Sequence, residues 1–292
     1  MKLFRKIETS NIGPGTLTFN RKKPILAKGG FYHGIMMWDF KTGVLVQELD
    51  NRSDYLGAIN FSPDGNFLVS ATDDGAIKLW RCVNSIWRLE NQFQGESGRI
   101  LSVALHSDND ALSRMNATTN KVEVWRLRAD TTPKVYVFGY VAFHQNQPLV
   151  AIRKSERLIV VNYITDEIIF DAYVGDHLSQ IAFGKNGNSI ATINDSGELE
   201  LLDLQTKSRQ IFSRPGDYAV KVIIPTNRAI ACVLYESGAI AIWDINDGIL
   251  KETTYTKLYQ ADGMAISHQG NFLAVGSGAI DGGSIELWQL DF

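Results

Sequence analysis

Apolar and polar residues alternate along the chain in seven similarly spaced segments, each ending at a tryptophan or an aliphatic residue. We call these end residues anchors. They are separated by 36 to 45 residues and are Trp38, Trp80, Trp125, Val161, Leu202, Trp243 and Trp288. The residues one and three positions before each anchor are apolar in all seven segments, as in Leu287 and Ile285 before Trp288. Because side chains alternate between the two faces of a strand, this pattern predicts a β-strand at each anchor.

Turn-forming residues divide each segment further. The stretch 61–80 (FSPDGNFLVSATDDGAIKLW) has one turn at Pro63–Gly65 and a second at Asp73–Gly75, and the anchors at 38 and 243 are followed by the similar turns WDFKTGVL and WDINDGIL. Gly and Asp supply the backbone conformations that tight hairpins need. Each segment is therefore predicted to be four strands joined by three turns, which is the repeat of a propeller blade.

The two ends of the chain are complementary. The last segment stops just after its third strand (284–288), whereas residues 2–8 precede the first complete segment and could form a strand. We predict an all-β fold: a single seven-bladed β-propeller of four-stranded antiparallel blades, closed by N-terminal strand pairing into the last blade. The expected blades are about 11–50, 51–93, 94–137, 138–173, 174–213, 214–255, and 256–292 together with 1–10.

The turn and anchor motifs resemble those of the WD40-repeat family, and the resemblance extends over essentially the whole chain. It implies structural roles for Trp38, Asp39, Thr72, Asp74, Trp80, Trp125, Trp243, Asp244 and Trp288. Blades of this family share a buried hydrogen-bonded chain of His, Ser or Thr, Asp and Trp. The second blade keeps Thr72, Asp74 and Trp80 but has Arg52 where the family has His, and the other blades keep less. We therefore expect apolar packing to stabilise most blades.

Composition narrows the classes of partner. The 292 residues are 45% hydrophobic and 21% charged with a net charge of −3, which is typical of a soluble globular protein and gives no reason to expect nucleic acid or a membrane as partner. The basic stretch Arg21–Lys23 is either a solvated turn, the interpretation we favour, or a local binding patch. Two isolated cysteines and an N-terminus without the apolar region of a signal peptide favour a reducing, cytoplasmic location.

Candidate chemistry is sparse. His106, His144 and His268 fall in the first turns of three blades and could in principle hold a metal, but the blades are not all adjacent, so we expect surface turn residues. No phosphate-binding loop, H-E-x-x-H or G-x-S-x-G motif is present. We expect no catalytic residue, no cofactor and no metal, and we predict that the protein is not an enzyme.

The loops between blades and the turns between second and third strands emerge on one rim of a propeller, and the resemblance implies that this rim is the partner site. The candidate partner-binding residues are Phe31, Tyr55, Asp73, Arg99, Lys154, His177, Asp195, Tyr218, Glu236, Gln260 and Asp281. Aromatic residues and arginine are enriched in interface hot spots. The acidic residues suggest a partner with a basic segment, although acidic residues also simply suit tight turns.

The sequence thus predicts a non-catalytic scaffold or adaptor that binds another protein or peptide, as a monomeric propeller within a hetero-complex. Two alternatives stay open. One is a metal-dependent hydrolase or lactonase built on a propeller frame. The other is the sensor module of a larger signalling or defence assembly.

Overall fold

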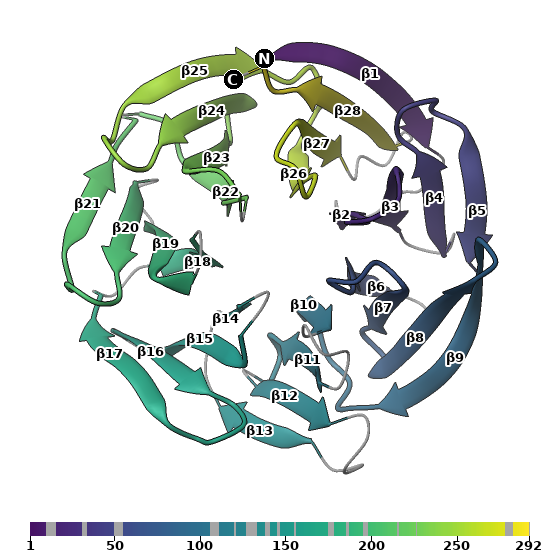
Figure 1. Cartoon of the computed structure of the whole chain (residues 1–292), viewed down its shortest axis with the longest axis horizontal. Helices are drawn as coiled ribbons and strands as arrows, with labels where there is room; N and C mark the ends of the chain where they lie inside the picture. The colour runs from purple at the N-terminus through teal and green to yellow at the C-terminus, as the bar shows by residue number, and fades with distance from the viewer. Residues whose placement is uncertain are drawn as a thin grey trace.

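Seven four-stranded antiparallel sheets surround a central axis, as the sequence predicts (Figure 1). The computed structural model describes residues 1–9, 16–30, 34–49, 55–105, 111–119, 121–126, 133–137, 141–144, 147–154, 156–174, 178–184, 187–194, 198–214, 216–225, 227–277 and 283–291. No helix in these residues is long and apolar enough to cross a membrane. The fold is an all-β seven-bladed propeller.

Each sheet forms one blade, numbered here from the first complete one. Blade 1 contains β2 (Leu17–Phe19), β3 (Ile25–Gly29), β4 (Ile35–Asp39) and β5 (Leu45–Leu49). Blade 2 contains β6 (Leu56–Phe61), β7 (Phe67–Thr72), β8 (Ala76–Val83) and β9 (Ile86–Gln94). Blade 3 contains β10 (Ile100–Leu105), β11 (Ala111–Asn116), β12 (Lys121–Arg126) and β13 (Lys134–Val137). Blade 4 contains β14 (Val141–Phe143), β15 (Leu149–Lys154), β16 (Arg157–Asn162) and β17 (Ile168–Tyr173). Blade 5 contains β18 (Leu178–Phe183), β19 (Ser189–Asn194), β20 (Leu199–Asp203) and β21 (Arg209–Phe212). Blade 6 contains β22 (Ala219–Ile223), β23 (Ile230–Tyr235), β24 (Ala239–Asp244) and β25 (Leu250–Tyr255). Blade 7 contains β26 (Ala261–Ile266), β27 (Phe272–Ser277), β28 (Gly283–Gln289) and β1 (Lys2–Thr9).

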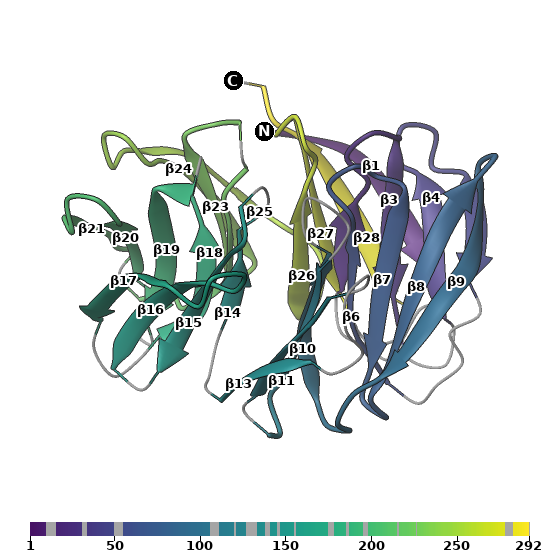
Figure 2. The same cartoon turned by 60° about the horizontal axis from the view of Figure 1, so that its bottom comes forward.

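The first residues of the chain complete the last blade. Strand β1 pairs antiparallel with β28 from Lys2 opposite Gln289 to Thr9 opposite Gly283, so the N-terminal strand is the outermost strand of blade 7. Both termini lie next to each other at this blade (Figure 2). The predicted closure is confirmed, and it leaves β28 with a hydrogen-bonded neighbour on each side.

The core lies mainly between blades. One cluster joins Ile35 and Met37 of blade 1 to Leu56, Leu68 and Trp80 of blade 2, all nearly inaccessible to solvent. The central strands, such as β7 and β23, are buried almost throughout because adjacent blades cover both of their faces. The outer strand β9 is mostly exposed. Burial of apolar surface between blades is the dominant stabilising term for such an arrangement.

The anchor residues occupy the positions that the pattern predicts. The five anchor tryptophans are all buried. Asp39 and Asp244 cap the turns that follow two of them: Asp39 Oδ1 accepts the backbone N–H groups of Lys41 and Thr42, each at 2.9 Å. Asp244 Oδ1 accepts the N–H of Asn246, also at 2.9 Å.

The polar residues of blade 2 do not form the continuous hydrogen-bonded chain that is typical of the WD40 family. Thr72 Oγ1 donates to Asp74 Oδ1 at 2.6 Å, but Trp80 Nε1 donates to Ser70 Oγ at 3.0 Å. Asp74 is exposed and holds its own turn by accepting the N–H of Ala76. The network is therefore split into two separate hydrogen bonds. Ser70 lies two residues before Thr72 on the same face of β7, and it accepts the indole N–H of Trp80 in place of Thr72.

A lysine is buried between blades 7 and 1. Lys28 is fully inaccessible, and its Nζ donates to the carbonyl oxygen of Ser277 at 3.3 Å. Burial lowers the pKa of the Lys28 amine from 10.5 to about 8, and the nearby Asp262 carboxylate only partly opposes this shift. Below pH 8 the amine is charged in both the folded and the unfolded chain, so folding bears the full cost of burying it. That cost disappears as the pH rises from about 8 towards 10.5.

Lys28→Met is expected to raise the free energy of unfolding at pH 7 by about 2 kcal/mol. The shifted pKa corresponds to roughly 3 kcal/mol, and the lost hydrogen bond to Ser277 offsets about 1 kcal/mol. Chemical denaturation between pH 7 and 10.5 measures this. The wild-type protein should gain stability relative to the variant as the pH rises, whereas Met in place of the exposed Lys257 should leave both stability and its pH dependence unchanged. A Lys28→Met variant less stable than the wild type at pH 7 would contradict the assignment.

Candidate functional site

The loops between blades and the turns between second and third strands meet on one rim, which we call the candidate rim. The backbone N–H of Asp73, in the second turn of blade 2, donates to the carbonyl of Tyr55, in the loop that enters the blade, at 2.9 Å. The equivalent bond in blade 6 runs from the Glu236 N–H to the Tyr218 carbonyl at 2.8 Å. These bonds hold the two sets of loops at fixed positions relative to each other.

Five of the predicted partner-binding residues are exposed on the candidate rim. They are Tyr55, Arg99, Tyr218, Glu236 and Gln260. Tyr55 is 44% exposed and Tyr218 is 56% exposed, which is high for side chains of this size. Phe31, His177, Asp195 and Asp281 lie outside the described residues, and of Lys154 only the backbone at the end of β15 is described.

Asp73 has a structural contact within the propeller. One of its carboxylate oxygens, Oδ1, accepts the N–H of Ile100, the first residue of blade 3, at 3.0 Å. Its carbonyl accepts the N–H of Gly98 at 2.7 Å. Asp73 is half-buried and links two blades, so its replacement would disturb the rim itself as well as any partner contact.

Two exposed tyrosines on this rim are missed by the projection of the repeat. Tyr259 directly precedes Gln260 and is 74% exposed, and Tyr255 ends β25 beside the second turn of blade 6. Gln260 itself adopts a left-handed backbone conformation with φ of 49°. The projection takes one residue from each loop, the one directly before the first strand, so it selects Gln260 as it selects Tyr55 and Tyr218 and omits Tyr259.

An arginine organises the tyrosines of blade 6. Arg214 Nη2 donates to the Tyr255 hydroxyl at 2.9 Å, and the guanidinium lies 5.2 Å from the centre of the Tyr235 ring. Burial raises the pKa of Tyr235. Asp217 accepts the Ser237 hydroxyl at 2.5 Å and so ties the inter-blade loop to the second turn. Hydrogen bonds thus fix the loop that carries Tyr218 to the turn that carries Glu236.

The expectation that the turn histidines are surface residues is wrong for His144. Its side chain is buried, its Nδ1 accepts the N–H of Gln147 at 2.8 Å, and its ring meets Phe183 of the next blade edge to face at 5.2 Å. Burial lowers the pKa of His144. The turn folds the ring back against the neighbouring blade, where aromatic contact and burial are gained together.

The other histidines give no metal centre in the part of the chain that the structure describes. His268 is exposed, and His106 lies outside the described residues. Within the described ranges, no group of three or more His, Cys, Asp or Glu side chains is placed to hold a metal ion.

Comparisons with known proteins agree with this fold. A family model described as "WD domain, G-beta repeat" matches residues 43–81. The β-propeller domain of Cps50 (Swd1) from Myceliophteria thermophila superposes with a TM-score of 0.82 over 99% of both chains, at 13% sequence identity. The chain thus contains a recognised WD40 repeat, and its fold is a seven-bladed β-propeller.

Two relatives are named as subunits of one complex. The target of rapamycin complex subunit wat1 of Schizosaccharomyces pombe is 24% identical over 59% of this chain and 57% of its own length. The target of rapamycin complex subunit LST8 of Saccharomyces cerevisiae is 19% identical over 79% of this chain and 80% of its own length. The chain thus spans less than two thirds of wat1, and it covers only 25% of a further relative, the WD repeat and SOCS box-containing protein 1 of Takifugu rubripes. The chain is similar to subunits of protein complexes.

Proposed function

We propose that this protein is a non-catalytic scaffold or adaptor that binds a protein partner on the candidate rim. The observation that carries the proposal is the exposure of Tyr55, Tyr218 and Tyr259, which come from the loops entering blades 2, 6 and 7. Tyrosines on a base fixed by hydrogen bonds lose little conformational freedom on binding, so they are suited to be interface hot spots. The relatives that are named as subunits of the target of rapamycin complex support a role within a hetero-complex.

The partner segment is proposed to be basic. Glu236 is exposed beside Tyr218, and its backbone is tied to that residue. A lysine or arginine of the partner could pair with this carboxylate and lie over an exposed tyrosine ring. We propose further that the chain acts in the cytoplasm as one propeller per complex.

The double variant Tyr218→Ala and Tyr259→Ala is expected to weaken partner binding at least thirtyfold, which corresponds to the loss of about 2 kcal/mol typical of a hot spot. The variant should keep the wild-type melting temperature, because both side chains are exposed. The measurement is affinity purification from the native host with quantitative mass spectrometry, followed by titration of the partner that is lost. Glu236→Lys should weaken the same interaction, most strongly at low salt.

Ile249→Ala is the matched control. Ile249 is 58% exposed, and it lies in the third turn of blade 6, on the opposite rim from Tyr218. Its replacement should leave the set of captured proteins unchanged. Equal capture by wild type and the double tyrosine variant would place the partner elsewhere on the propeller, and a partner sensitive only to Ile249→Ala would place it on the opposite rim.

A further inference from the structure

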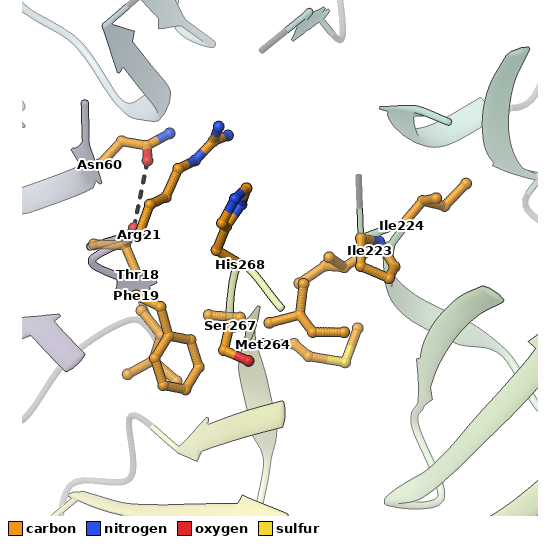
Figure 3. Close-up of a pocket in the computed structure, with 13 residues that line it drawn as sticks. Thr18, Phe19, Arg21, Asn60, Ile223, Ile224, Met264, Ser267 and His268 are labelled. Atoms are coloured by element: carbon orange, nitrogen blue, oxygen red, sulfur yellow. Dashed lines mark hydrogen bonds between the residues drawn. The ribbon is translucent and has the colours of Figure 1, made fainter. Parts of the chain in front are cut away.

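A pocket of about 220 Å³ lies at the central axis on the rim opposite the candidate rim (Figure 3). Its lining comes from the innermost strands and first turns of blades 6, 7, 1 and 2, so it spans the junction where blade 7 meets blade 1. The lining residues are Leu17, Thr18, Phe19, Arg21, Asn60, Ile223, Ile224, Pro225, Met264, Ala265, Ile266, Ser267 and His268. Most of them are apolar by type, but Phe19 and Met264 are buried in the core, so the surface that the pocket presents is mainly polar.

Three nitrogen-bearing side chains face the same part of this pocket. Arg21 and His268 come from the first turns of blades 1 and 7, and Asn60 comes from the innermost strand of blade 2 (Figure 3). The Asn60 amide oxygen lies 3.4 Å from the Thr18 hydroxyl, which donates to it, so the amide NH₂ group is directed away from Thr18. Three hydrogen-bond donors from three blades therefore converge.

The electrostatic environment of these donors is positive. Partial desolvation lowers the pKa of the exposed His268, and the positive charges of Arg21 and Lys22 lower it further. Arg21 is half-buried and stays charged at neutral pH. Among the described residues that line the pocket, none is acidic. An anion placed between Arg21 and His268 would accept hydrogen bonds from both groups and would be attracted by the Arg21 charge.

We propose that this pocket binds a carboxylate, with Arg21, His268 and Asn60 donating to its oxygens. A planar guanidinium matches the two oxygens of a carboxylate. A free small acid and the C-terminus of a peptide both carry such a carboxylate. Both sources present the same chemistry.

The test uses the full chain labelled with ¹³C at its methionine methyl groups. The probes are 4-methylpentanoate, its neutral amide, and the peptide Ser-Gly-Ser-Leu with a free or an amidated C-terminus. Met264 lines the pocket, whereas Met115 is buried in blade 3 and serves as the internal control. Saturable shifts of the Met264 signal with the acid, and not with its amide, are expected. A response to the free-ended peptide but not to its amide would identify a chain terminus as the source, and a response to the acid alone would identify a free small molecule.

Arg21→Met is expected to weaken the binding of 4-methylpentanoate at least tenfold, because it removes the charge but keeps much of the side-chain volume. His268→Gln should weaken it less; this variant also guards against misfolding because His268 is exposed. The matched control is Arg228→Met, since Arg228 lies on the same rim but donates to Asn271 and does not line the pocket. Equal responses to acid and amide, equal shifts at Met115 and Met264, or no response to any probe would overturn the proposal.

Discussion

Removal of residues 1–9 is expected to lower the melting temperature by more than 10 °C and to make the protein prone to aggregation. Without β1, the outer edge of β28 loses its hydrogen-bonded partner along seven paired positions. An exposed strand edge is a template for pairing with other chains. The loss should be on the order of 5 kcal/mol or more, since each protein hydrogen bond contributes about 1 kcal/mol and the buried side chains contribute further.

The contacts of β1 explain why its removal is expected to act on the whole ring. The N-terminal amine pairs with Glu252 of blade 6, Ile7 is buried against Ile285 and Leu287 of blade 7, and Arg5 Nη2 donates to the Lys41 carbonyl of blade 1 at 3.0 Å. Residues 1–9 thus make contacts within blade 7 and with the blades on both sides of it. Loss of these contacts opens the junction between the two ends of the chain.

Thermal and chemical denaturation of the truncated protein measure the effect. Addition of a synthetic peptide of residues 1–9 should restore part of the lost stability, because the truncation leaves an unpaired edge on β28 to which this peptide can pair. Leu3→Ala, at a position that is 42% exposed on the same strand, is the control and should cost little. A truncated protein with the melting temperature of the wild type would contradict the prediction that closure stabilises the fold.

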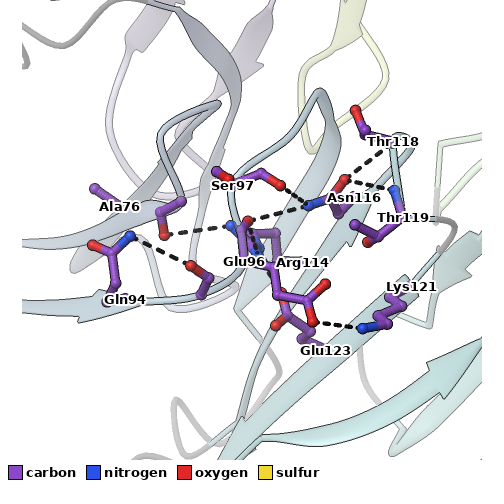
Figure 4. A network of polar contacts seen from close by, with 12 residues as sticks. Ala76, Gln94, Glu96, Ser97, Arg114, Asn116, Thr118, Thr119, Lys121 and Glu123 are labelled. Carbon is purple, nitrogen blue, oxygen red and sulfur yellow. Dashed lines mark hydrogen bonds and ion pairs between the residues drawn. The ribbon is translucent and has the colours of Figure 1, made fainter.

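Arg114→Met is expected to destabilise the protein by about 3–5 kcal/mol, a range typical of breaking a buried ion pair from one side. Arg114 is fully buried on β11 and faces Glu123 on β12, with Nε 2.9 Å from Glu123 Oε2 (Figure 4). Its Nη2 also donates to the Glu96 carbonyl at 2.7 Å and its Nη1 to the Gly75 carbonyl at 3.3 Å. The arginine therefore joins blade 3 to the second turn of blade 2 and to the loop between them.

The variant leaves the Glu123 carboxylate buried without its partner, which is the main source of the expected loss. Urea denaturation measures it. The double variant Arg114→Met and Glu123→Leu should be markedly more stable than Arg114→Met alone, because it removes the buried charge as well. Arg81→Met, at an exposed arginine paired with Glu90 on the surface, should cost less than about 1 kcal/mol. A double variant no more stable than the single one would show that the bonds to the two carbonyls, and not the ion pair, dominate.

The strands and the closure could be predicted because they depend on local patterns. The alternation before Trp288 and the turn residues around Pro63 and Asp73 each specify a strand or a hairpin without reference to distant residues. The outer strand of blade 7 could be predicted by counting strands, since the last segment has only three and the N-terminal residues add one before the first complete segment. The exposure of Tyr55 and Tyr218 followed from the same register.

The polar contacts between blades could not be predicted in this way. Alternation placed Glu123 between two apolar positions, and Arg114 lies opposite it on the next strand of the same blade. It gave no sign that Arg114 would also donate to the Gly75 and Glu96 carbonyls, because these belong to blade 2 and to the loop that follows it. His144 was expected at the surface, yet its position depends on Phe183 of the neighbouring blade. Tyr259 was missed because the projection takes only the residue directly before each first strand, and the exposed tyrosine of this loop lies one residue earlier.

The sequence by itself determined the repeat, the strands within it and the pairing of the two chain ends, because period-two burial and turn chemistry act over a few residues. Only the tertiary structure decided which side chains from different blades lie together, namely the donors at the pocket near the junction of blades 7 and 1 and the contacts of the buried lysine and arginine. Such meetings depend on how adjacent blades pack, and residues far apart in the sequence carry no local mark of that packing.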